Sequence, residues 1–327
     1  MSAALDLWIL LVALLAEAAF GYPRRLLDEF GHPVMWFGRL IDLLEGRLNR
    51  PADSFESRRI AGVMALGLLL GATVGPALIV QLLVVSSLPG TGSVMVLGLL
   101  ASSLLAQRSL HAHVADVARA LDHDGVTAGR VAVSQIVGRD TSVLDGAGIS
   151  RAALESLAEN FSDGVTAPAI WCALGGLPGA VLYKAVNTAD SMIGHRTARH
   201  EAFGWAAARL DDLLNLPASR LSALWIMLAA ATMKDADPAA AWRAIWRDAP
   251  RHKSPNAGWP EAAMAGALGL RLNGPKLYGG KLREDAWMGS GREQASAADI
   301  RRGLDLYRRA CAIQILVAGG LALAILR

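Results

Sequence analysis

The chain has 327 residues, of which 53% are hydrophobic and 19% are charged, against roughly 25% charged residues in ordinary soluble domains. Its mean hydropathy is +0.35. The net charge of +3 is small and the basic residues form no stripe with interleaved aromatic side chains, which argues against nucleic-acid binding. The two cysteines lie in apolar segments without metal-ligand spacing, which argues against a zinc site or a disulfide framework. Charges collect between long apolar runs instead, and this pattern is typical of a membrane protein.

Four apolar runs predict transmembrane helices, because a span needs about 20 residues. They cover residues 3–20, 60–85, 94–107 and 310–326, of which 94–107 is short and must borrow neighbouring residues. The first run is interpreted as a span rather than a signal peptide, since no basic residue precedes it. Between the second and third runs, the uncharged segment 86–93 contains Pro and Gly and predicts a tight turn.

Charge asymmetry predicts the orientation. Residues 21–59 contain seven Arg and residues 234–309 contain fourteen Lys plus Arg, whereas the turn at 86–93 contains none. By the positive-inside rule, the two basic regions are cytoplasmic, and the turn and the N-terminus lie outside. Residues 108–121 and 148–163 repeat apolar positions at helical spacing, and no run alternates as a strand does. The sequence therefore predicts an all-α, polytopic membrane protein that forms a single membrane-embedded domain over residues 1–327.

Two further apolar segments are ambiguous. Residues 164–183 contain two prolines and four glycines, and residues 213–233 contain Arg220 and Pro217. Either both segments cross the membrane or neither does, because the regions before and after them are both predicted to be cytoplasmic. We favour re-entry or packing on the cytoplasmic side, since Pro and Gly in a lipid-exposed helix leave backbone groups unsatisfied.

Polar residues gather in four clusters, of which the first follows Gly31. His32 and Pro33 predict a loop that ends before a helix, and Arg39 lies further along that helix. A helix-start turn at the membrane surface explains these residues equally well.

The second cluster is acidic. On a helix, Glu155, Glu159 and Asp163 lie at positions i, i+4 and i+8 and share one face, where like charges repel unless a cation or donor answers them. A solvated acidic face is the alternative, but the segment leads directly into an apolar stretch, which favours burial. Such carboxylates suit Mg²⁺, which commonly takes one or two carboxylates plus substrate phosphates.

The third cluster spans residues 184–196 and combines two cations, a carboxylate, an amide and a hydroxyl group. Its members are Lys184, Asn187, Asp190, Ser191 and Arg196, and Asp212 follows shortly after them. Structural ion pairing would explain about half of these residues, and it explains the whole set less well.

The fourth cluster, residues 252–261, holds Lys253, Ser254, Asn256 and Glu261 around a loop fixed by two prolines and a glycine. A cation beside a hydroxyl group and backbone amides predicts an anion site. Neither GxxxxGK[ST] nor GxGxxG occurs in the chain, so a bound ATP would not be held by a Walker-type loop.

At these clusters the chain resembles the adenosylcobinamide-phosphate synthases of cobalamin biosynthesis. The matching stretches keep their order and spacing up to about residue 280: HPVMWFGRLIDLLE (32–45), VGRDTSVLD (137–145), ESLAENFSDGVTAPAIW (155–171), YKAVNTADSMIGHR (183–196), FGWAAARLDDLLNLPASRL (203–221) and SPNAGWPEAAMAGALG (254–269). The chain departs from the resemblance at His195 and His200, where the family is expected to have tyrosine.

The resemblance implies an integral membrane ligase that joins adenosylcobyric acid to 1-amino-2-propanol or its O-phosphate in an ATP- and Mg²⁺-dependent step. Residue type and motif position assign catalysis to Glu155, Glu159, Asp163 and Asp190, the last three also being Mg²⁺ ligands. Substrate and anion binding is assigned to the other polar members of the clusters: His32, Arg39, Lys184, Asn187, Ser191, Arg196, Asp212, Lys253, Ser254, Asn256 and Glu261.

Two other function classes are alternatives. A transporter also combines polar groups with broken apolar segments, but the clusters lie mostly outside the clear spans and no inverted repeat is visible. A non-catalytic scaffold for other corrinoid-pathway enzymes would not need so many acids and amides beside membrane segments. The expected location is the cell (inner) membrane with the site facing the cytoplasm. Contacts with other corrinoid-pathway membrane enzymes and homo-oligomerisation are left open by the sequence.

Overall fold

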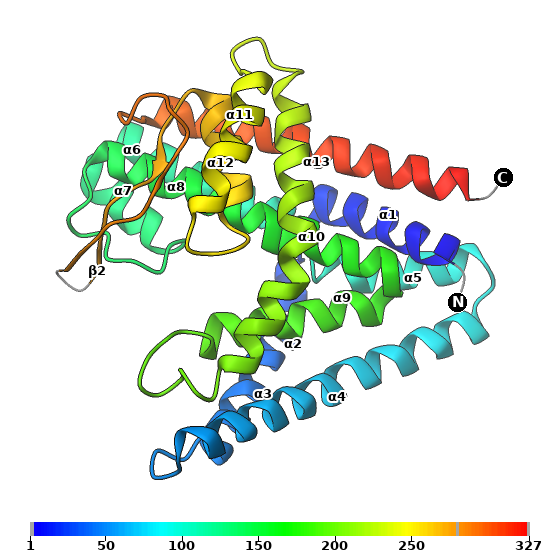
Figure 1. Cartoon of the computed structure of the whole chain (residues 1–327). Coiled ribbons are helices and arrows are strands. Elements are labelled where there is room, and N and C mark those ends of the chain that lie inside the picture. Colours follow the sequence, from blue (N-terminus) through cyan, green and yellow to red (C-terminus); the bar gives the residue numbers. More distant parts are fainter. Residues whose placement is uncertain (1–2, 279–280, 326–327) are drawn as a thin grey trace. The chain divides into compact units, whose positions relative to one another are not determined.

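The structure, a computed structural model, describes residues 3–278 and 281–325, and the side chains of this range except 276–283. Most of the described chain is helical (Figure 1). The helices in chain order are α1 Ala3–Phe20, α2 Arg24–Phe30, α3 Pro33–Leu48, α4 Phe55–Ser87, α5 Thr91–Ser102, α6 Gln107–His123, α7 Gly125–Ser134, α8 Gly146–Phe161, α9 Ala167–Ile193, α10 Trp205–Ala230, α11 Pro238–Asp248, α12 Gly258–Leu268 and α13 Ala297–Ala324. A π-helical turn, η1 Ser162–Thr166, follows α8, and a 3₁₀ turn, η2 Ala249–Arg251, follows α11.

Four short strands interrupt the helical pattern between α12 and α13. They are β1 Leu272–Asn273, β2 Lys276–Tyr278, β3 Lys281–Arg283 and β4 Trp287–Met288. β1 pairs antiparallel with β4, and β2 pairs antiparallel with β3. Strands of two or three residues are too short to show an alternating pattern in the sequence, and they leave the all-α class unchanged.

Among the described residues, six helical segments are long and apolar enough to span a membrane, which confirms the all-α, polytopic prediction. They are Ala3–Phe20, Phe55–Ser87, Thr91–His123, Gly146–Ile193, Trp205–Ala230 and Ala297–Ala324. The runs 3–20, 60–85 and 94–107 fall inside these segments, the described part of the run 310–326 overlaps the last of them, and the predicted turn separates α4 from α5. The ambiguous run 164–183 lies inside Gly146–Ile193, and the run 213–233 overlaps Trp205–Ala230 but extends beyond its end, so each run overlaps a helical segment long enough for a crossing. Their re-entry stays a prediction.

The described chain forms two compact units. Unit 1 comprises residues 1–106, 167–215 and 317–327, and unit 2 comprises residues 107–166 and 216–316. The single membrane-embedded domain expected from the sequence stays a prediction.

Unit 1 is a bundle in which α9 packs against α1, α3, α4 and α5. Small residues allow close approach of these helices, as is common in membrane bundles. A Cβ atom at Gly98 of α5 would lie 2.5 Å from the Val12 side chain of α1. A Cβ atom at Gly62 of α4 would lie 1.9 Å from the Phe203 carbonyl oxygen. Unit 1 therefore depends on glycine where its backbones meet.

The helix α9 is broken within its apolar part. Gly176 adopts φ 60° and ψ −144°, a conformation that glycine reaches without a Cβ clash, and Pro178 follows closely. The N–H of Leu177 has left the helical ladder and donates to Oε1 of the buried Gln81 on α4 at 2.7 Å. A neighbouring helix thus satisfies the backbone group that the break releases, as a lipid environment requires.

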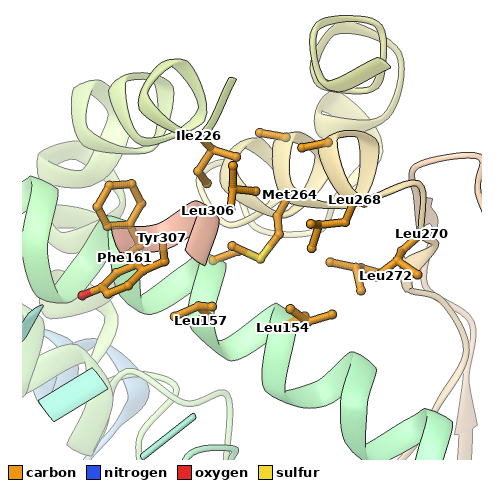
Figure 2. Packing of buried hydrophobic residues seen from close by; sticks show 14 of the residues in the cluster. Leu154, Leu157, Phe161, Ile226, Met264, Leu268, Leu270, Leu272, Leu306 and Tyr307 are labelled. Carbon is orange, nitrogen blue, oxygen red and sulfur yellow. The ribbon is translucent and has the colours of Figure 1, made fainter. Parts of the chain in front are cut away.

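Unit 2 has a continuous apolar core formed by α6, α8, α11, α12 and parts of α10 and α13. Figure 2 shows side chains of α8, α12 and α13 meeting in this core. Leu154, Leu157 and Phe161 lie at helical spacing on one face of α8 and are fully buried, which confirms the predicted amphipathic helix. The ring of Phe161 contacts that of Tyr307 edge-on, with centroids 5.4 Å apart. α8 is thereby fixed along its length, and its polar face carries the acidic residues of the second cluster.

Candidate functional site

A buried hydrogen-bond network links α9 and α10 in unit 1. Tyr183 donates its hydroxyl to Asn215 Oδ1 at 2.9 Å, and the Asn215 amide donates to Asp211 Oδ2 at 2.9 Å. The Asn187 amide donates to the other carboxylate oxygen of Asp211 at 3.3 Å. Helical spacing produces the network, because Tyr183 and Asn187, and likewise Asp211 and Asn215, lie four residues apart on one helix face. A carboxylate is thus held in fixed orientation within an apolar pair of helices.

Asp190 adds a second carboxylate to this network, close enough to Asp211 for the two charges to repel. A Cβ atom at Gly194 would lie 1.9 Å from Asp190 Oδ1, so only glycine fits where the chain leaves α9 beside this carboxylate. Two facing carboxylates attract a cation or share a proton. Of the pair at 211 and 212, sequence analysis selected Asp212, which is half-buried near Arg209 at 3.6 Å. Asp211 is the buried member, and its i, i+4 relation to an asparagine is the signal that could have found it.

His32 and Lys184 come together in unit 1. His32 caps the N-terminus of α3, where its Nδ1 accepts from the Val34 N–H at 3.3 Å, so the predicted loop and helix start are confirmed. The ring of Tyr22 lies 4.5 Å from the His32 ring. Burial lowers the pKa of His32, and the charge of Lys184 lowers this pKa further. The imidazole is therefore neutral at neutral pH, and because its Nδ1 accepts from the Val34 N–H, its hydrogen lies on Nε2, which can donate a hydrogen bond to a substrate oxygen.

Three other predicted residues of unit 1 are exposed. Arg39 lies on α3, Ser191 lies near the end of α9, and Arg196 lies in the loop that follows α9. The Ser191 hydroxyl donates to the Asn187 carbonyl at 2.9 Å, as serine commonly does within a helix. The two guanidinium groups are accessible to an anionic substrate.

An ion-pair clamp in unit 1, which sequence analysis missed, holds the loop between α9 and α10. Glu45 is buried on α3 and accepts from Arg199 Nε at 2.7 Å and from Arg199 Nη2 at 2.5 Å. The hydrogen bonds from Arg199 lower the pKa of Glu45 and outweigh the opposing effect of burial, with a further contribution from Asn49. His200, one of the two departures from the family pattern, lies 3.7 Å from the same carboxylate. The clamp fixes the loop in which Arg196 lies.

In unit 2, the loop before α12 is organised around Asn256. Asn256 Oδ1 accepts from Arg220 Nη1 at 3.1 Å and from Ser219 Oγ at 3.2 Å. The guanidinium of Arg220 lies 4.3 Å from the ring centroid of Trp259, within cation–π range. The Asn256 N–H donates to Ser254 Oγ at 3.2 Å. Arg220, which sequence analysis regarded only as an obstacle to a membrane span, is thus the residue that orients the Asn256 amide.

The remaining residues of the fourth cluster form two further contacts. His252 Nδ1 accepts from the Ser254 N–H at 3.0 Å, so a neutral His252 ring carries its hydrogen on Nε2, which lies 3.8 Å from Glu261 Oε2. Glu261 is buried at the start of α12. Lys253 forms an ion pair with Asp285. The predicted anion-binding lysine therefore shares its charge with an acidic loop.

The acidic face of α8 divides into three environments. Glu155 is buried, Glu159 is exposed and Asp163 is half-buried. The expected burial therefore holds for Glu155 and is wrong for Glu159. Regular α-helical spacing also stops short of Asp163, because this residue lies in the π-helical turn η1, and a π turn rotates successive side chains differently. Glu155 Oε2 lies 3.1 Å from an Arg139 nitrogen, and Glu155 Oε1 accepts from the Asn273 N–H at 2.8 Å.

Within the described part of the chain, no three His, Cys, Asp or Glu side chains form a group that could hold a metal ion. Mg²⁺ nevertheless commonly needs only one or two carboxylates when phosphate oxygens and waters complete its shell. Glu159 and Asp163 in unit 2, and Asp190 in unit 1, are carboxylates of that kind, with partial or full exposure. Each of these carboxylates has the chemistry of a Mg²⁺ ligand beside a phosphate, and the Mg²⁺ site stays a prediction.

The chain matches the family model described as "CobD/Cbib protein" over residues 10–307. The "Cobalamin biosynthesis protein CobD" of Rhodobacter capsulatus is 48% identical over 311 residues, which cover 95% of this chain and 96% of that protein. The protein of the same name from Rhizobium meliloti (strain 1021) is 46% identical over 323 residues, which cover 98% of each chain. No solved structure matches the chain.

Proposed function

The chain belongs to the CobD/Cbib protein family, and from this premise we propose that it acts in cobalamin biosynthesis as an ATP- and Mg²⁺-dependent amide ligase. The reaction would join the free propionate carboxylate of adenosylcobyric acid to the amine of 1-amino-2-propanol or of its O-phosphate. The observation that carries the proposal is similarity over nearly the whole length to relatives named for cobalamin biosynthesis. The protein is a multi-pass membrane protein, and we place it in the inner membrane with its site on the cytoplasmic side, where ATP is available.

The proposed chemistry has two steps. A carboxylate is a poor acyl donor at neutral pH, so transfer of the γ-phosphoryl group of ATP to a propionate oxygen would form an acyl phosphate and ADP. The amine nitrogen would then attack the acyl carbon, which forms the C–N bond, breaks the C–O bond to phosphate and releases a proton from nitrogen. Such transfers depend mainly on positioning and on charge around the phosphates. Bound Mg²⁺ would neutralise phosphate charge.

The residues support this chemistry in separable ways. Glu159, Asp163 and Asp190 are the proposed Mg²⁺ carboxylates. The ammonium group of Lys184 is a proposed anion contact, and the neutral imidazole of His32 is a proposed hydrogen-bond donor to a substrate oxygen. Lys184 and Asp190 lie on the largely apolar helix α9, where partial burial strengthens their electrostatic contacts.

Turnover by the detergent-solubilised full chain tests the proposal. With adenosylcobyric acid, an amino alcohol or its phosphate, ATP and Mg²⁺, the expected result is the corrinoid amide together with ADP. Product formed equally well without any nucleotide would overturn the ligase mechanism. Corrinoid uptake into proteoliposomes without chemical change would favour the transporter instead.

A matched pair of variants links the turnover to the acidic residues of unit 2. Asp163→Asn should abolish most turnover, whereas Asp116→Asn, which alters an exposed carboxylate paired with Arg119 on α6, should leave turnover intact. Equal activity of the two variants would remove Asp163 from the proposed site.

A further inference from the structure

Unit 2 contains a polar cavity. Part of its wall comes from VGRDTSVLD, a stretch that matches the family pattern and that the proposed function does not use. The cavity has a volume of about 320 Å³, within the range of small-molecule sites. It lies at the loop that joins α7 to α8, which contains the stretch VGRDTSVLD. Its lining includes Arg139, Asp140, Val143, Arg151, Glu155 and Asn273. We propose that this cavity binds a phosphate group of a substrate, one that arrives with its own positive charge.

Arg139 is the first cation of the cavity. Its side chain is only 10% exposed, and one of its terminal nitrogens lies 3.1 Å from Glu155 Oε2. Its buried Nε–H has no hydrogen-bond acceptor among the described residues. Leaving a buried, charged donor without an acceptor is costly, so such groups are usually satisfied by a bound partner. The group in the cavity wall that lacks a partner among the described residues is therefore a hydrogen-bond donor, and an anion could accept from it.

Arg151 is the second cation, and its position is fixed from outside the cavity. Its Nη1 donates to the Glu293 carbonyl at 2.7 Å, and its guanidinium lies 5.9 Å from the ring centroid of Trp287. Within the described part of the chain, the other N–H groups of its planar fork make no hydrogen bond, so they are available for a ligand. Arginine is the residue that best matches the oxygens of a phosphate, because its fork donates two parallel hydrogen bonds.

The carboxylates of the cavity restrict which phosphate fits. Asp145 caps α8 by accepting from the Gly148 N–H at 2.7 Å, and the exposed Asp140 accepts from the Ser142 N–H at 2.9 Å. Together with Glu155, they oppose two arginines with three negative charges. A bare polyanion would be repelled by such a wall. A phosphate accompanied by an ammonium group in the same molecule, or by Mg²⁺, matches it better.

The backbone at Asn273 supports a functional role for the cavity wall. Asn273 has φ 62° and is the one non-glycine residue with positive φ in the described part of the chain. Its N–H donates to Glu155 and its side chain donates to the Ala286 carbonyl at 2.9 Å, which hold this conformation. Asparagine tolerates the left-handed region better than most residues, and conformations of this kind gather at binding sites.

Two substrates of the proposed ligase carry the required chemistry, namely Mg²⁺-bound ATP and the O-phosphate of 1-amino-2-propanol. These two sources depend on the proposed function, whereas the phosphate site itself does not. Isothermal titration of the full chain in detergent with each compound, and with inorganic phosphate and the unphosphorylated amino alcohol, separates them. The compound whose affinity falls when the cavity is altered is the one whose phosphate group binds there.

Three variants make the titration decisive. Val143→Trp fills the cavity from an exposed position without removing a charge, and Arg151→Gln removes one cation that has no carboxylate partner in the cavity. Both should weaken binding of the phosphate compound by roughly 10- to 100-fold, the loss expected for hydrogen bonds to a charged group. Arg119→Gln, which removes an exposed arginine of the same unit outside the cavity, is the matched control and should bind as the wild type does.

The outcomes also separate this inference from the proposed ligase. Phosphate compounds that bind equally well to the wild type, Val143→Trp and Arg151→Gln, or that do not bind at all, overturn the cavity site. Normal corrinoid amide formation by Val143→Trp does so as well and leaves the ligase intact. Cavity-dependent binding in a protein that makes no corrinoid amide supports the phosphate site and overturns the ligase.

Discussion

The Asp248→Asn substitution probes how α11 holds the cavity wall in place. Asp248 is 2% exposed at the end of α11 and accepts from the Gly289 N–H at 2.8 Å and from Arg247 at 2.8 and 2.6 Å. Gly289 directly follows β4, and β4 pairs with β1, where Asn273 lies opposite Trp287. Asp248 therefore anchors the strand pair that presents Asn273 to Glu155.

The magnitude follows from which of these bonds are buried. The side chain of Arg247 is 49% exposed, so its ion pair with Asp248 contributes little beyond a surface salt bridge. Two effects dominate the change in the free energy of unfolding. The charge-assisted hydrogen bond from the buried Gly289 N–H is weakened, and the Asn amide brings a donor against the donors of Arg247. We expect a destabilisation of about 1.5–3 kcal/mol. For a unit of this size, that lowers the melting temperature by roughly 3–12 °C.

The pH dependence gives a second measure of the same interaction. Burial by itself raises the pKa of Asp248, but the hydrogen bonds from Arg247 and Gly289 outweigh burial and hold this pKa below its ordinary value of 3.8. A carboxylate with a depressed pKa in the folded state stabilises the fold above its unfolded pKa, and this stabilisation is lost as pH falls through the folded pKa. The difference in melting temperature between wild type and Asp248→Asn should thus be full at pH 7 and shrink below pH 3.8.

Thermal melting of the full chain in detergent, together with the phosphate titration, is the assay. Asp116→Asn serves as the control, because Asp116 is an exposed carboxylate of the same unit with an ion pair at the surface. Asp248→Asn should melt lower than this control and bind the phosphate compound more weakly. If the two variants melt alike at pH 7, Asp248 does not anchor the strand pair and the reasoning is refuted.

Three further predictions concern the acidic face, the orientation and the close approach in α4. Glu159→Gln should lower turnover by at least ~100-fold, the order expected when one key electrostatic group is lost, and should leave the melting temperature unchanged. A raised Mg²⁺ concentration should partly restore the turnover, and full activity of the variant would place Glu159 outside the site. Ser87→Cys should be labelled from outside intact cells and Ser54→Cys should not, and equal labelling would contradict the orientation. Gly62→Ala should lower the melting temperature, since its Cβ would lie 1.9 Å from a backbone carbonyl oxygen. Gly67→Ala is the control, because a Cβ there has nothing within 4 Å, and it should raise stability by up to ~1 kcal/mol. Equal melting of the two variants would refute the close approach at Gly62.

Elements with local causes could be predicted from the sequence. The run at 3–20 coincides with α1, because bilayer thickness dictates the length of an apolar run. His32 and Pro33 mark the start of α3, because a cap and an N1 proline act within a few residues. The strands β1 to β4 and the π turn η1 could not be predicted, since their short spans carry no periodicity of their own.

Residue type predicts which side chains have the chemistry for catalysis or binding. Whether such a side chain is available to a substrate depends on its contacts with residues distant in sequence. Lys253 looked like an anion contact, yet Asp285 from a later loop pairs with it. Asp211 looked like the lesser member of an acidic pair, yet asparagines on two helices orient it. The contact of Lys253 comes from a distant loop, which no local pattern could have revealed. The i, i+4 relation of Asp211 to Asn215 is local, whereas its contact with Asn187 comes from another helix.

Glu155 shows the same effect with a consequence for function. Its type and helix face were visible in the sequence, but its partners are Arg139, before α8, and Asn273, 118 residues further on. A carboxylate paired in this way is a positioning group for Arg139 rather than an exposed metal ligand, because breaking a buried pair strands the remaining charge. The proposed chemistry of the acidic face therefore falls to Glu159 and Asp163. Arg139, which Glu155 orients, lines the proposed phosphate cavity, and the Arg151 and Val143 variants test that cavity while leaving the buried pair intact.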